Sequence, residues 1–178
     1  MNQPNAAEVC EMNCIISILA AAFLLLRNRH ERRSMTRRQI REHVLRLVFD
    51  LSFREKEEWD EQIRLYIEQA PDEDIENPPL FASAQEKEYI AVKAGKIAQS
   101  FDRIDEMLND TAKGWTTKRM GKCDLSILRL AVYEMLFDDQ IPVGVAINEA
   151  VELAKIYGQE ESASFINGIL AKIAPKEA

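Results

Sequence analysis

Apolar residues recur at helical spacing along most of the chain from about residue 36 onward. Between residues 40 and 51 they are three or four positions apart, which at about 100° per residue places them on one side of a helix. Similar stripes return in several later segments, and no useful length of sequence alternates between apolar and polar residues. The pattern therefore predicts an all-α fold, a helical bundle of about seven helices in two sub-bundles.

Start and stop signals divide the pattern into separate helices. Thr36 is predicted to cap the first helix, and Ser83 followed three residues later by Glu86 is typical of a capping box. Pro71 should end the second helix because proline has no backbone N–H to donate. Gly158 is placed as a C-terminal cap.

The segment from residue 125 to residue 137 is apolar on nearly every side. A helix of this kind belongs in the middle of a bundle, because each of its faces must be covered. We expect Asp124 to cap its N-terminus. In the same way Ser162 should cap the last helix, which Pro175 ends.

The first 34 residues differ from the rest of the chain. Their apolar run, residues 15–26, has 12 residues, whereas a helix needs about 20 to span a bilayer. Glu8 and Glu11 stand where a secretory signal would carry positive charge. We expect residues 1–34 to be an upstream extension and residues 35–178 to form a single helical domain. A membrane-associating tail and a cleaved leader are the alternatives.

Charge is distributed unevenly. The formal net charge is -7, and acidic residues crowd positions 55–76, which does not suggest bulk binding to nucleic acid. Arginines crowd the first helix instead, where Arg37, Arg38 and Arg41 fall within an arc of about 100° beside the apolar stripe. Arg46 points elsewhere. The three arginines form either a solvated helix edge or a group that binds phosphate.

Catalytic chemistry is scarce in this sequence. It has no glycine-rich phosphate loop, no nucleophile elbow and no zinc-protease motif. Glu149 and Glu152 resemble half of a di-carboxylate metal site, but the partner motif is missing. We therefore expect no enzyme, no cofactor and no metal. Cys10, Cys14 and Cys123 do not make a disulfide framework, which favours a reducing compartment, the cytoplasm.

Three runs of sequence resemble one known family. Residues 124–135, 147–155 and 165–170 are similar to the NusB family of bacterial transcription antitermination factors, and Arg-Arg-x-x-Arg-Glu at residues 37–42 resembles the arginine-rich opening of that family. The similarity covers about residues 36–175 and is loose in the middle. The same domain also occurs fused to RNA cytosine methyltransferases of the RsmB type. Because this chain ends at Ala178, we expect the free-standing factor.

The resemblance implies a role in antitermination complexes with RNA polymerase on ribosomal RNA transcripts. In this family the protein pairs with NusE, a ribosomal protein of the small subunit, and the pair binds single-stranded boxA RNA. Matched position by position, the residues implied to bind RNA are Arg37, Arg38, Arg41, Glu161 and Phe165, and those implied to face the partner are Phe49 and Asp124.

Each assignment has a structural alternative. Phe165 begins an apolar stripe and is typical of core packing, Asp124 is first of all a helix cap, and Phe49 lacks the hydroxyl of the tyrosine that many relatives carry. For the whole chain, the rival hypothesis is a protein-only helical adaptor whose acidic face docks a basic partner. A weaker one is an RNA-binding accessory domain of RsmB-type methyltransferase systems. The sequence leaves open whether two copies form a homodimer.

Overall fold

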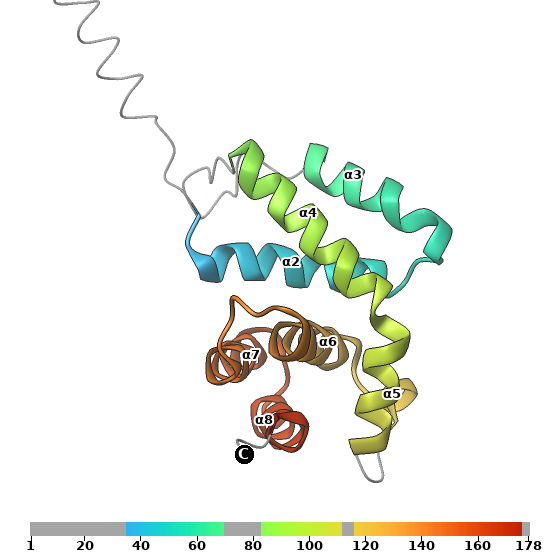
Figure 1. The fold of residues 1–178 in the computed structure, drawn as a ribbon. Helices are drawn as coiled ribbons and strands as arrows, with labels where there is room; N and C mark the ends of the chain where they lie inside the picture. The colour runs from blue at the N-terminus through green and yellow to red at the C-terminus, as the bar shows by residue number, and fades with distance from the viewer. Residues whose placement is uncertain (1–34, 70–82, 112–115, 176–178) are drawn as a thin grey trace, which may run out of the picture. The chain divides into compact units, whose positions relative to one another are not determined.

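A computed structural model describes residues 35–69, 83–111 and 116–175. These residues contain seven α-helices and no strand, which confirms the predicted all-α class (Figure 1). The predicted leader, residues 1–34, and the Pro71 stop signal lie outside the described residues. The helices are α2 (Arg37–Leu51), α3 (Trp59–Gln69), α4 (Ala84–Gln99), α5 (Phe101–Thr111), α6 (Lys122–Phe137), α7 (Val143–Tyr157) and α8 (Ser162–Ile173), with short 3₁₀ turns η1 (Lys56–Glu58) and η2 (Thr117–Arg119).

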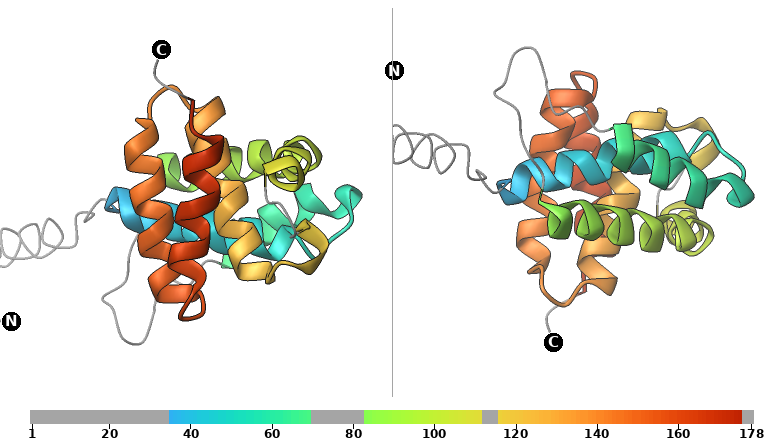
Figure 2. Two further views of the ribbon diagram at one scale, coloured as in Figure 1. Left: turned by 90° about the horizontal axis from the view of Figure 1, so that it is seen from below. Right: turned by 90° about the horizontal axis from the view of Figure 1, so that it is seen from above.

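The helices within residues 35–175 pack in two groups that meet at α6. Helices α2, α3 and α4 pack on one another, and α7 and α8 pack on α6 with α5 alongside (Figures 1 and 2). Helix α6 also contacts α2 and α4, so α6 and α7 lie between α2 and α8. No helix among the described residues is long and apolar enough to cross a bilayer.

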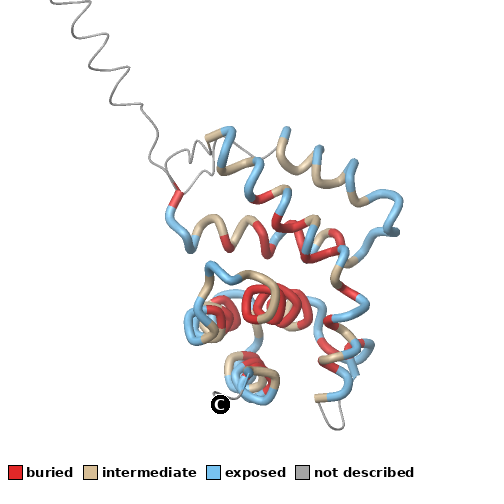
Figure 3. The backbone as a smooth tube through the Cα atoms, in the orientation of Figure 1, coloured by how far each residue is buried: buried red, intermediate tan, exposed pale blue. Residues whose placement is uncertain are grey.

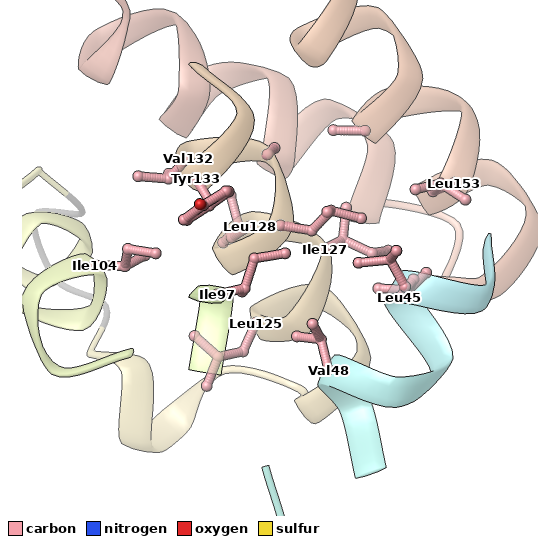
Figure 4. Close-up of a cluster of buried hydrophobic side chains, with 14 of the residues drawn as sticks. Leu45, Val48, Ile97, Ile104, Leu125, Ile127, Leu128, Val132, Tyr133 and Leu153 are labelled. Carbon is pink, nitrogen blue, oxygen red and sulfur yellow. The ribbon is translucent and has the colours of Figure 1, made fainter. Parts of the chain in front are cut away.

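Helix α6 is the centre of the core, as its sequence predicted. Its residues from Leu125 to Met135 are all buried (Figure 3). Leu128 lies in a cluster with Ile97 of α4, Ile104 of α5 and Leu153 of α7 (Figure 4). Each such side chain contributes about 1.5–3 kcal/mol by leaving water. The fold therefore depends on one helix whose every face is covered.

The predicted cap at Thr36 and the predicted capping box at Ser83 are present, and Thr36 also forms a capping box. The Thr36 hydroxyl accepts a hydrogen bond from the backbone N–H of Gln39, and Ser83 does the same for Glu86. The Glu86 carboxylate also accepts hydrogen bonds from the backbone N–H groups of Ser83 and Met35, both at 2.7 Å. One side chain thus fixes the first turn of α4 and the start of α2 together.

The predicted caps at Asp124 and Ser162 are wrong. Helix α6 begins at Lys122 with Gly121 at its cap position, so Asp124 lies inside the first turn. Helix α8 begins at Ser162 itself, whose hydroxyl accepts a hydrogen bond from the Gln159 backbone N–H at 2.9 Å. A short polar side chain is accommodated in a first turn as well as at a cap, so this signal missed the cap position by three residues at α6 and by one at α8.

Candidate functional site

The first turn of α2 carries two exposed arginines, Arg37 and Arg38. The amide dipoles of a helix leave partial positive charge at its N-terminus, where carboxylates are stabilising and cations are not. No acidic residue occupies this turn. Helix stability therefore does not account for the two arginines, whereas an anion would meet both the guanidinium groups and the helix N-terminus.

Arg38 lies beside two carboxylates without being buried by them. Its Nε is 3.6 Å from Glu42 Oε1, and its side chain remains 47% exposed. The pKa of the Glu152 carboxyl on α7 is lowered first by its hydrogen bond to Lys155 and to a smaller degree by Arg38. Helix α7 therefore borders this arginine. Such exposed ion pairs contribute little to stability, so the guanidinium can exchange them for other anions.

Arg41 is not on this exposed edge, contrary to the prediction. Its residue is 8% exposed, its Nε donates to Glu134 Oε2 at 3.0 Å, and its Nη1 donates to Glu149 Oε2 at 2.9 Å. It occupies the same helix face as Leu45 and Val48, four and seven residues later. Because that face points inward, Arg41 is turned away from ligands on the surface. Its guanidinium instead links α2 to α6 and α7.

Lys93 of α4 completes this buried cluster. Its Nζ donates to Glu134 Oε1 at 2.8 Å and to Asp138 Oδ2 at 3.1 Å. Burial alone would lower the pKa of the ammonium group, but Glu134, Tyr89 and Asp138 together outweigh it and the pKa is raised. Glu134 thus receives a cation from each side. Sequence reasoning missed this cluster, although a carboxylate in the middle of an apolar helix is the signal that buried cations must face it.

The two remaining residues implied to bind RNA lie near the start of α8. Glu161 is exposed immediately before the helix, and Phe165 packs half-buried against the core. Helix α8 packs on α5, α6 and α7, whereas Arg37 and Arg38 lie on α2, beyond the layer that α6 and α7 form (Figure 1). The predicted RNA-binding residues therefore come from two separate elements, the first half of α2 and the start of α8.

The two residues implied to face a partner lie where the end of α2 meets the start of α6. Phe49 is 38% exposed, and its ring packs edge-to-face against Phe53, with 5.1 Å between centroids. Lys122 Nζ lies 5.7 Å from the centre of the Phe53 ring, which is 58% exposed. Asp124 follows within the first turn of α6. Sequence reasoning missed Phe53 and Lys122, which link the two helix ends.

No group of three or more histidine, cysteine or carboxylate side chains within the described ranges could hold a metal ion. Glu149 and Glu152, which the sequence presents as half of a metal site, pair separately with Arg41 and Lys155. Exposed arginines and exposed aromatic rings, beside carboxylates that are already paired, form a surface suited to binding another molecule.

Comparison with known proteins identifies the family. The family model described as "NusB family" matches residues 38–175. The chain belongs to the NusB family. It is 48% identical over 139 residues to the transcription antitermination protein NusB of Lachnoclostridium phytofermentans, covering 78% of this chain and 98% of the relative. It is 44% identical to that of Agathobacter rectalis, covering 79% of this chain and 100% of the relative.

Solved structures share the fold. NusB of T. maritima, 31% identical, has a TM-score of 0.67 and covers 79% of this chain and 92% of its own. A chain from the structure called "Crystal Structure of a Plectonemic RNA Supercoil" is 23% identical, with a TM-score of 0.59 and coverage of 77% and 92%. The resemblance noted from the sequence is confirmed. The family is named for transcription antitermination, which agrees with the prediction of a regulatory factor rather than an enzyme.

Proposed function

We propose that this NusB family member is an RNA-binding transcription antitermination factor that pairs with NusE and binds boxA RNA on ribosomal RNA transcripts. Such a role places it in the cytoplasm, where bacterial transcripts are made. The observation that carries the proposal is the pair of exposed arginines, Arg37 and Arg38, in the first turn of α2, where a helix favours acidic residues.

The chemistry of the first turn suits single-stranded RNA. A guanidinium group offers a planar fork of donors that matches a phosphate group, and the helix N-terminus adds partial positive charge. The protein as a whole is acidic, with a formal net charge of -7. Long-range attraction to duplex nucleic acid is therefore weak, and affinity must come from local contacts that salt screens.

The aromatic surface of Phe49 and Phe53 supports a separate site for NusE. An exposed aromatic pair flanked by Lys122 and Asp124 offers apolar area together with both signs of charge. Aromatic residues often dominate the binding energy of protein interfaces. The RNA contacts of Arg37 and Arg38 and the partner contact of Phe49 would then lie at opposite ends of α2.

The proposal is tested by titrating labelled boxA RNA at several salt concentrations, with and without NusE. In single-stranded RNA each lost phosphate contact reduces the slope of log affinity against log salt by about 0.7. Replacing both Arg37 and Arg38 with glutamine should therefore reduce the slope by about 1.4. The matched control replaces Lys118 and Arg119, two adjacent exposed cations in η2, with glutamine and should leave the slope unchanged.

The protein-only adaptor predicts a different result. The chain would then bind NusE without RNA, and both double variants would behave alike. A Phe49→Ala variant separates the two surfaces, because it should weaken NusE binding by more than about fivefold and leave RNA binding by the chain alone intact. If the Arg37 and Arg38 double variant and the Lys118 and Arg119 double variant lost RNA affinity equally, the proposed RNA site would be contradicted.

A further inference from the structure

Arg46 lies on the solvent-exposed face of α2, although the sequence set it apart from the other arginines. With Arg41 turned inward, the outward face of the helix runs through Arg38, Glu42, Arg46 and Phe49, at helical spacings of four, four and three residues. Arg38 and Arg46 are eight residues apart, which corresponds to about 12 Å along the helix axis. A single surface therefore leads from the first turn of α2 towards its C-terminal end.

Tyr157 at the end of α7 lies near the exposed Arg46 side chain. Burial lowers the pKa of the Arg46 guanidinium, but Tyr157, Tyr66 of α3 and Glu42 lie near enough to raise it overall. Among the described residues Arg46 forms no ion pair within 4.0 Å, so its charge is not neutralised by a direct carboxylate contact. The charge of Arg46 is therefore available to a ligand.

The position of Tyr157 is fixed by its backbone. The Cys123 thiol donates to the Tyr157 carbonyl oxygen at 3.2 Å, and the following residue, Gly158, makes the turn into α8. A Cβ at Gly158 would lie 2.5 Å from Ser162 Cβ, so any larger residue would force the turn to shift. The side chain of Tyr157 is nevertheless 37% exposed. A ring on a rigid backbone beside a guanidinium offers stacking and phosphate binding at one place.

We propose that Arg46, together with Tyr157 beside it, is a second anchoring point for single-stranded RNA, reached by a strand that contacts Arg37 and Arg38 and continues along the exposed face of α2. This inference rests on the proposed function and extends its RNA site. Arg46 binds a phosphate group, and the Tyr157 ring stacks on a neighbouring base. Glu42, between the two arginines, keeps the strand at the flanking cations by repelling phosphate from the middle of the face.

The test is an RNA titration over a range of salt concentrations with an Arg46→Gln variant of the full chain. Loss of one phosphate contact should reduce the salt slope by about 0.7 and the affinity at 0.1 M salt by about fivefold. The matched control is Arg64→Gln, which removes the same charge from an exposed arginine of α3 that pairs with Glu61 and Glu68. The control should bind RNA as the unaltered protein does.

Tyr157 variants measure the stacking contribution separately. Tyr157→Leu should lower RNA affinity by about fivefold or more at every salt concentration, because a lost base–aromatic stack carries no counterion term. Tyr157→Phe keeps the ring and should retain most of the affinity. Thermal unfolding of each variant confirms that the fold is intact before affinities are compared.

The possible outcomes separate this inference from the proposed function. If the Arg37 and Arg38 double variant loses RNA affinity while Arg46→Gln does not, the second anchoring point is refuted and the proposed function stands. If Arg46→Gln weakens NusE binding alone, this face is a protein interface and the inference is likewise overturned. If the unaltered protein binds no RNA with or without NusE, both fail.

Discussion

Truncation of Arg41 to alanine would remove three hydrogen bonds from the centre of the fold. Two go to Glu134 and one goes to Glu149, at distances from 2.9 to 3.2 Å. Removing one partner of a buried ion pair costs about 3–5 kcal/mol, because the other charge stays buried without compensation. Here Lys93 still contacts Glu134 at 2.8 Å, so we expect the lower end, about 3 kcal/mol.

The assay is urea unfolding followed by circular dichroism, with Arg38→Ala as the matched control. Arg38 is an exposed arginine on the same helix, and its removal should cost less than about 0.5 kcal/mol. The unfolding midpoint of Arg41→Ala should fall while the denaturant slope stays constant. In a thermal experiment, about 3 kcal/mol corresponds to a decrease in Tm of about 6–12 °C for a chain of this size.

RNA binding by the same variants completes the test. The buried position of Arg41 predicts that Arg41→Ala, measured below its melting transition, keeps the RNA salt slope that Arg38→Ala reduces. If Arg41→Ala loses less than about 1 kcal/mol of stability and reduces the salt slope as much as Arg38→Ala does, Arg41 contacts RNA and the reasoning from burial is refuted.

Two further predictions concern the cluster and the turn into α8. The pKa of Lys93 is raised in the folded protein from its ordinary value of 10.5, so its stabilising contribution is complete below that pH and is lost as pH rises through the folded-state pKa. Alkaline urea titrations should therefore show stability falling above about pH 10.5, and a Lys93→Met variant should lose less over that range. Gly158→Ala should lower stability by about 1–3 kcal/mol, because the added Cβ would meet Ser162 Cβ at 2.5 Å and the Ala154 carbonyl oxygen at 2.6 Å. An unchanged Tm for Gly158→Ala would show that the α7–α8 turn relaxes without strain.

Local patterns were sufficient for the helices and some of their ends. Apolar spacing predicted about seven helices, and the described residues contain seven. The cap at Thr36 and the capping box at Ser83 formed as expected, because each depends on contacts within one turn. Asp124 and Ser162 failed as caps although the helices they were meant to start are present. A helix start is decided by the backbone before it as well as by the capping residue, and Gly121 allowed α6 to begin earlier than Asp124 would indicate.

The candidate site was only partly accessible from the sequence. The arginine-rich opening was visible, and the exposure of Arg37 and Arg38 agreed with it. The sequence placed Arg41 on an exposed edge with them, whereas the structure turns it inward beside Leu45 and Val48. Its partners come from 93 and 108 residues away, and only packing brings them together.

The sequence by itself determined the class of fold, the helices and the family, because periodicity, capping and family resemblance are all properties of neighbouring residues. Tertiary structure alone decided which arginines face solvent. A helix wheel shows which residues share a side of α2, whereas the direction of that side depends on α3, α4 and α6 packing against it. The burial of Arg41 and the meeting of Arg46 with Tyr157 are products of that packing.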